Sequence, residues 1–172
     1  ASGDPEIDYL VQFEKRFGRD DNLLLLLVEA DDVFRLDVLR YVERLTRNAG
    51  AMHGLFRRVD SLTTVSDLGN TEEGAVDTRP LFEVIPDDPA RLAALRRRAL
   101  SSPLLGGRVV AKDAGLAVVA LNLRVGLQRA KDLERVSAAM ERLLEQIRRP
   151  PGVRARLFGV PYVRAEAGRL VK

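Results

Sequence analysis

The chain has 172 residues, 46% of them hydrophobic and 31% charged, which is typical of one folded domain and excludes a disordered or fibrous chain. It has no cysteine and one histidine, His53, which excludes disulfides, zinc–thiolate sites, iron–sulfur clusters, thiol nucleophiles and two-histidine metal sites. The net charge of +3 is unevenly distributed, because residues 1–90 carry 10 Lys+Arg against 19 Asp+Glu and residues 91–172 carry 18 against 6.

The chain is predicted to begin with a helix followed by a buried strand. Residues 1–21 carry apolar side chains at helical spacing, which indicates an amphipathic entry helix. The apolar run Leu23–Val28 has the length of a strand and no polar face, so we expect it in the middle of a sheet. The longest apolar runs have six residues, whereas a membrane-spanning helix needs ~20, so we expect no span.

A second helix and a second strand are predicted next. Apolar residues recur at three- and four-residue steps over 36–49, which predicts a helix that ends at Gly50. Asp31 or Asp32 would cap its N-terminus. Residues 56–65 intersperse polar with apolar and β-branched side chains, which predicts a less buried strand.

Residues 66–107 are predicted to form an insertion made of a loop and a helix. The first part, 66–78, is rich in Asp, Gly, Asn, Thr and Glu, which is typical of a surface loop. Asp88 followed by Pro89 is a helix-start signal, since the carboxylate can cap and the missing proline N–H costs nothing there. The helix is expected to end near Ser101.

The C-terminal part is predicted to supply two strands, a helix and a final strand. Residues 108–111 and 116–125 flank a turn and predict a hairpin whose second strand is central. A strongly amphipathic helix is expected to open near Asp132 and to close before Pro150. Residues 153–160 predict the last strand, and the tail that follows is polar and basic.

Without the insertion, this order of elements is β-α-β-β-α-β, the split β-α-β plan of ferredoxin-like α+β domains. Right-handed crossovers place the first and third strands of that plan in the centre of the sheet. Those are the two strands whose sequences are continuously apolar. We therefore predict a single α+β domain over residues 1–172, ferredoxin-like and carrying an inserted helical segment.

The sequence gives no set of residues that points to catalysis. Its adjacent acidic pairs lie mostly at element boundaries, where capping explains them. The hydroxyls of residues 61–64 have no base nearby in the sequence, and His53 follows a helix end, where it is typical of a dipole partner. No Walker, nucleophile-elbow or dinucleotide motif is present. We expect no catalytic residue, no metal and no cofactor.

A ferredoxin-like sheet together with many arginines, 24 of the 28 basic residues, raises nucleic-acid binding as an alternative. Ferredoxin-like RNA binders stack bases on aromatic side chains of the sheet. The aromatic content here is 5%, and the two predicted central strands have no aromatic residue. We therefore expect no nucleic-acid partner.

Short sequence pieces, taken in order, resemble the first large extracytoplasmic loop of resistance-nodulation-division (RND) superfamily exporters. The branch is the one that includes the mycobacterial large membrane proteins (MMPL) and the hopanoid-associated transporters. The pieces are Phe13-x-x-x-Phe17-Gly18, Asp21-Asn22, Val59-x-Ser61-Leu62-Thr63, Arg79-Pro80-Leu81-Phe82, Ile85-Pro86, Ser102-Pro103-Leu104-Leu105-Gly106, Val109-Val110-x-x-Asp113 and Gly159-Val160-Pro161.

The resemblance implies a porter subdomain of a proton-driven exporter, on the extracytoplasmic (periplasmic) face of the inner membrane. Acidic residues within membrane helices elsewhere would take up the proton, and the loop would gate by rigid-body movement rather than by catalysis. The implied partners are the second extracytoplasmic loop, the membrane helices, hydrophobic or lipid-like cargo and, in a homo-oligomer, a second copy. The alternatives are a free-standing ferredoxin-like binding module, regulatory or nucleic-acid binding, and an enzyme that uses carboxylates alone.

Two surfaces are predicted to bind partners. Leu81, Phe82 and Ile85 form an apolar segment beside the polar loop, which predicts a cargo-facing or interface surface; the alternative is that they pack into the core of the insertion. Arginines of the basic half are predicted to contact the partner loop or anionic lipid headgroups, the alternative being solvated faces. These arginines are Arg96, Arg97, Arg98, Arg154 and Arg156.

Overall fold

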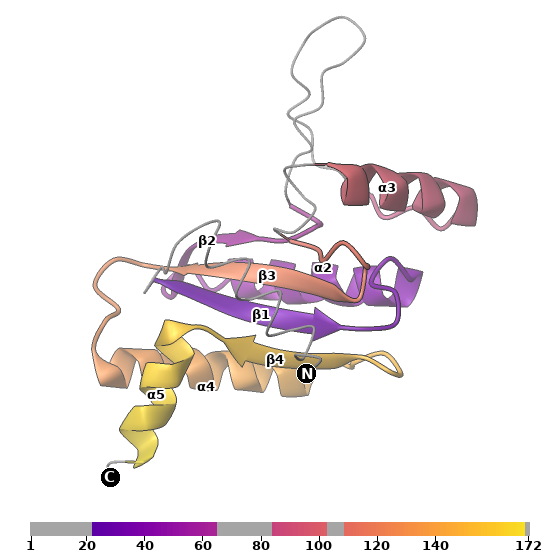
Figure 1. Ribbon diagram of the computed structural model, residues 1–172. Coiled ribbons are helices and arrows are strands. Elements are labelled where there is room, and N and C mark those ends of the chain that lie inside the picture. Colours follow the sequence, from indigo (N-terminus) through magenta and orange to yellow (C-terminus); the bar gives the residue numbers. More distant parts are fainter. Residues whose placement is uncertain (1–21, 65–83, 103–108, 171–172) are drawn as a thin grey trace, which may run out of the picture.

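A computed structural model describes residues 22–64, 84–102 and 109–170. Within them, the strands form a single antiparallel sheet in the order β2-β3-β1-β4 (Figure 1). The strands are β1 (Leu23–Glu29), β2 (Phe56–Asp60), β3 (Leu116–Leu123) and β4 (Arg154–Phe158). The helices are α2 (Leu36–Gly50), α3 (Pro89–Ser101), α4 (Ala130–Gln146) and α5 (Val160–Leu170). This is an α+β domain with the ferredoxin-like order of strands and helices, as predicted.

The two continuously apolar strands are central, as the sequence predicts. β1 pairs with β3 from Leu23 opposite Asn122 to Glu29 opposite Leu116, and with β4 on its other side. Every residue from Leu24 to Val28 is at most 4% exposed. A strand that is paired on both edges and packed against apolar side chains on both faces has no solvent-exposed position, so its sequence is apolar throughout.

The main core lies between the sheet and the two helices α2 and α4, which run behind it in Figure 1. Alternate residues of β1 point into it, among them Leu24 and Leu26. Leu39 and Leu45 of α2 enter from the other side and are fully buried. Each such side chain contributes ~1.5–3 kcal/mol on burial, so this layer accounts for most of the stability of the domain.

A smaller apolar cluster lies on the opposite face of the sheet. Its buried members are Leu25, Leu27, Leu116 and Val118. Phe158 of β4 packs against them. No helix of the described residues contributes a side chain to this cluster. The predicted entry helix of residues 1–21 lies outside the described residues.

The second strand is shorter than predicted. β2 ends at Asp60, so the predicted strand over 56–65 is wrong in its second half. The chain turns there because the backbone N–H of Ser61 donates to Oγ1 of Thr64 at 2.8 Å, and the N–H of Thr64 donates to the carbonyl of Ser61 at 3.1 Å. Hydroxyl side chains often close turns in this way and compete with strand pairing.

Of the two predicted helix caps, the one on α3 is confirmed and the one on α2 is wrong. Asp88 caps α3, accepting from the N–H of Ala90 at 2.9 Å. The cap of α2 at Asp31 or Asp32 was wrong, because the helix begins after Arg35, which makes no side-chain cap. Asp32 instead accepts from the N–H of Phe34 at 2.9 Å and closes the turn before the helix.

The segment after β4 contains a helix that the sequence did not predict. α5 follows β4 and packs against α4 in place of a polar tail. The last strand stops at Phe158 because Gly159 has φ +123° and approaches the backbone of β1 closely; a Cβ there would lie 2.8 Å from the carbonyl oxygen of Leu23. The predicted hairpin before β3 is reduced to an isolated bridge between Val110 and Ala117.

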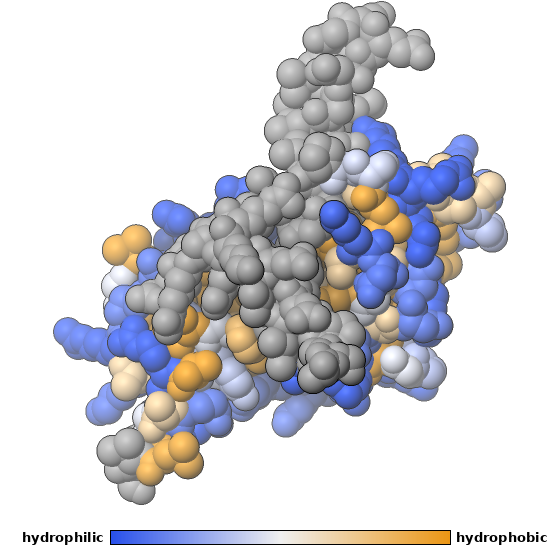
Figure 2. All heavy atoms as spheres, viewed as in Figure 1, coloured by the Kyte–Doolittle hydropathy of each residue, from blue (hydrophilic) through white to orange (hydrophobic). Residues whose placement is uncertain are grey.

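The inserted helix α3 is joined loosely to the rest of the domain. Ala99 is its one buried residue. Arg96 pairs with Asp32 in the turn before α2 at 3.1 Å, and Arg40 of α2 pairs with Asp87 just before α3. The region of α3 in Figure 2 is mostly hydrophilic with a few apolar side chains among them.

Candidate functional site

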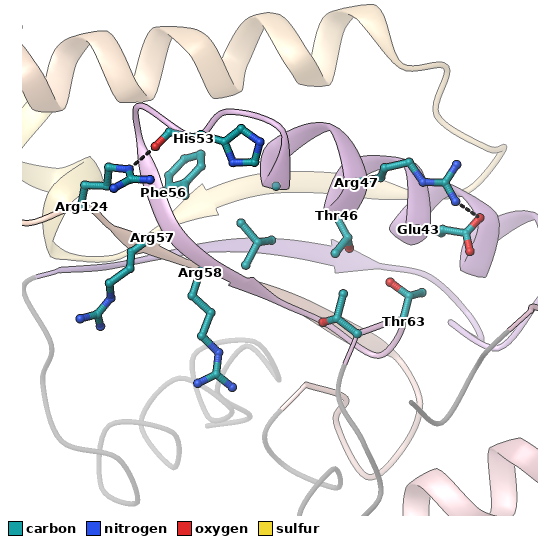
Figure 3. A pocket seen from close by; sticks show the side chains of 12 residues that line it. Glu43, Thr46, Arg47, His53, Phe56, Arg57, Arg58, Thr63 and Arg124 are labelled. Carbon is teal, nitrogen blue, oxygen red and sulfur yellow. Dashed lines mark hydrogen bonds and ion pairs between the residues drawn. The ribbon is translucent and has the colours of Figure 1, made fainter. Parts of the chain in front are cut away.

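A cavity of about 730 Å³ opens beside β2, an edge strand of the sheet, and the C-terminal half of α2. Basic side chains, four arginines and a histidine, form a large part of its lining. They are Arg47, His53, Arg57, Arg58 and Arg124. The α2–β2 connection brings them together, because it folds the end of the helix back beside the edge strand. Figure 3 shows Arg57 and Arg58 extending from β2 away from α2.

The arginines of this cavity differ in the ion pairs and hydrogen bonds that they form. Arg47 pairs with Glu43 one turn earlier at 3.5 Å, and Arg58 pairs with Asp60 two residues later at 2.7 Å. The Arg124 guanidinium donates to the carbonyl of His53 (Figure 3). Arg57 forms no ion pair with any described residue. Because these groups are exposed, their pairs exchange readily with an incoming anion.

A chain of hydroxyls lies at the inner end of the cavity. Oγ1 of Thr46 donates to the carbonyl of Val42 at 2.6 Å and lies 2.8 Å from Oγ of Ser61. Ser61 in turn lies 2.9 Å from Oγ1 of Thr63. Thr46 and Ser61 are buried, so their bonds to each other satisfy hydroxyls that water cannot reach.

The cavity provides no activated nucleophile among the described residues. The hydroxyls of Thr46, Ser61 and Thr63 bond to one another and to backbone, with no bond to His53 or to a carboxylate. A hydroxyl attacks only when an adjacent base accepts its proton. No cluster of three or more metal-ligating side chains occurs within the described ranges. The arrangement can bind a polar or anionic group through its guanidinium and hydroxyl donors.

Of the three residues of the predicted apolar surface, the structure describes Ile85. Ile85 is 8% exposed and packs with the main core, whereas its neighbour Val84 is 81% exposed. Ile85 lies just before α3, inside the predicted insertion, and a cargo or interface role for it stays a prediction. Leu81 and Phe82 lie outside the described residues.

The predicted arginines are not brought to one place. Arg96, Arg97 and Arg98 are on α3, while Arg154 and Arg156 are on β4, the edge strand farthest from β2 (Figure 1). Arg96 pairs with Asp32, and Arg154 pairs with Glu29 of β1 at 3.3 Å. Arg97, Arg98 and Arg156 are exposed. These arginines therefore form two separate surfaces.

The residues of the cavity beside β2 were not predicted as a site. The adjacent pair Arg57 and Arg58 on a half-exposed strand was the local signal available, and the same pattern is common on solvated strand edges. Arg124 comes from the far end of β3, so its place in the cavity depends on the pairing of β2 with β3.

Fold and site together define an α+β domain of ferredoxin-like topology with a cavity lined by several arginines beside its edge strand β2. No protein-family model, no curated protein and no solved structure matches the chain. None of the helices in the described parts of the chain is long and apolar enough to cross a membrane.

Proposed function

We propose that the chain is an extracytoplasmic porter domain of a proton-driven RND-type exporter, in the MMPL or hopanoid-associated branch. It binds hydrophobic or lipid-like cargo and gates its passage at the periplasmic face of the inner membrane without catalysis. The observation that carries the proposal is the sheet order β2-β3-β1-β4, with α3 inserted between β2 and β3. This is the ferredoxin-like plan with an inserted helical segment that the sequence pattern predicted for the segment resembling a porter subdomain.

The attachment of α3 supports a gating role. The helix is joined to the body by two solvent-accessible ion pairs, Arg96 with Asp32 and Arg40 with Asp87, by the buried Ala99 and by half-buried leucines that pack against the main core. Exposed pairs are worth ~0–1 kcal/mol each, so the ion pairs add little to the cost of shifting α3 as a unit. Rigid-body shifts of this kind are how porter loops would open and close a path.

The absence of an activated hydroxyl in the described cavity supports binding over catalysis. The partners in this proposal are the second extracytoplasmic loop and the membrane helices of the parent exporter, its cargo and, in an oligomer, a second copy.

Labelling of single cysteines in the parent protein tests the location. The chain has no cysteine of its own, so Val125→Cys, at a position that is 90% exposed, adds one reactive thiol. In intact cells we expect a membrane-impermeant maleimide to label it as fully as after lysis. Val118→Cys, at a position buried in the sheet, is the matched control and should stay unlabelled in both states.

Labelling of Val125→Cys only after lysis would contradict the proposal. It would leave the free-standing binding module as the better account, which is then tested by titration with RNA and with acidic ligands. The parent without an introduced cysteine gives the background.

A further inference from the structure

A second cavity, of about 300 Å³, lies where α2 meets the loop between α4 and β4. Four arginines line it: Arg40 and Arg44 come from α2, and Arg148 and Arg149 come from the loop. Asp37 is the single carboxylate among the lining side chains. None of these arginines belongs to the surfaces that the sequence predicted.

The positive charge of this cavity is poorly neutralised. Asp37 is already occupied, because Arg35 donates to its two oxygens at 3.1 and 2.7 Å. Arg40 pairs with the exposed Asp87. Arg44, Arg148 and Arg149 form no ion pair with any described residue. Three guanidinium groups around a small cavity therefore have their donors available for a ligand.

The cavity is built on fixed backbone. Arg40 and Arg44 are one helical turn apart on the same face of α2. The loop carrying the other two arginines continues into Pro150 and Pro151, whose rings restrict φ. Arg35 donates to the carbonyl of Pro151 at 3.3 Å and thereby joins the loop to the start of α2. The two halves of the cavity are thus held at a set separation.

A phenol adds an uncharged donor. Tyr41 lines the cavity and is 3% exposed. Its burial raises the pKa of the phenol, and the positive charge of Arg149 acts in the opposite direction. The phenol therefore stays protonated at neutral pH and can donate to an oxygen of an anion in the cavity, which Arg149 also lines.

We propose that this cavity binds a phosphate group, carried either by a lipid headgroup or by a small soluble phosphate ester. Guanidinium groups form paired, charge-assisted hydrogen bonds with phosphate oxygens. Like charges at i and i+4 repel in the empty cavity, so an anion between Arg40 and Arg44 also relieves that repulsion. The inference rests on this cavity alone and is independent of the proposed function.

The test is a calorimetric titration of the 172-residue chain with inorganic phosphate at low salt. The double variant Arg148→Gln, Arg149→Gln is expected to weaken phosphate binding by about tenfold or more, because two charge-assisted contacts are lost. The single variant Arg44→Gln, on the opposite wall, should weaken it severalfold. The control Lys131→Gln, Arg142→Gln removes the same charge from exposed positions of α4 and should change binding by less than about twofold.

A second arm separates the two sources of phosphate. Vesicles of phosphatidylglycerol and phosphatidylcholine are compared with pure phosphatidylcholine vesicles in sedimentation. Binding of the mixed vesicles that the loop double variant weakens assigns a lipid headgroup; phosphate binding without vesicle binding assigns a soluble ester. Both support the site. No phosphate binding, or equal losses in the loop variant and the control, overturns it.

Discussion

Helices α2 and α3 have similar lengths, 15 and 13 residues, yet they contribute very differently to the domain. α2 buries seven side chains, six of them in the main apolar core, whereas α3 buries Ala99 alone. α2 is therefore fixed by apolar packing, and α3 is fixed by ion pairs and a few half-buried leucines. The comparison teaches that one chain combines a ferredoxin-like body held by extensive apolar burial with an inserted helix that buries little of its own surface.

Shortening one leucine in each helix tests this contrast most strongly. Leu39→Ala in α2 removes a fully buried side chain and should lower the free energy of unfolding by ~2–5 kcal/mol. Leu95→Ala in α3, at a half-buried position, should cost far less. Urea denaturation followed by circular dichroism measures both. Equal losses would show that α3 is as much a part of the core as α2.

The next largest loss of stability is expected from the hydroxyl chain of Thr46, Ser61 and Thr63, which lies in the body of the domain and away from α3. Ser61→Ala removes the partner of Thr46 and Thr63 and should cost ~1–2 kcal/mol, because a buried hydroxyl loses its bond. Thr64 is exposed, and Thr64→Ser keeps its hydroxyl, so that variant is a control expected to be nearly neutral. No loss in Ser61→Ala would mean that these hydroxyls find water.

The N-terminal cap of α3 tests whether this helix can unfold locally while α2 stays folded. Asp88→Ala removes the bond to the N–H of Ala90 and should destabilise the helix by ~1 kcal/mol. Because α3 is weakly attached, we expect faster amide hydrogen exchange in α3 and unchanged exchange in α2. Asp88→Asn keeps a capping oxygen and should restore the slower exchange. Faster exchange in both helices would make them one cooperative unit.

The ion pair between α3 and the body should have the smallest effect. Arg96→Gln removes the contact with Asp32 and should cost less than ~1 kcal/mol, with the loss diminishing as salt rises. Arg97→Gln, on the same helix and exposed, is the matched control. A salt-independent loss would mean that Arg96 acts through packing of its stem.

The fold could be predicted where a pattern was long and regular. The runs in β1 and β3 have no polar face, and α2 and α4 have a clear apolar stripe, so element type and sheet position both follow from the sequence. α5 was missed because it buries only Pro161 and Ala165 and shows little periodicity. The end of β2 was missed because its turn depends on side-chain bonds between Ser61 and Thr64.

The two arginine-lined cavities could not be predicted from local sequence. Arg44 and Arg149 are distant in the chain and meet only because α2 and the α4–β4 loop lie together. Arg57 and Arg124 likewise share a cavity through the pairing of β2 with β3. Arginine runs were visible in the sequence, but their partners Asp32 and Glu29 were not, and those partners decide which charges are neutralised.

The central claim, that this domain is a loop of a membrane exporter, is tested most directly by the full-length reading frame of the parent. The account predicts an apolar segment of ~20 residues shortly before residue 1 and another shortly after residue 172. A frame with no such segment on either side would contradict it and leave a free-standing ferredoxin-like binding module.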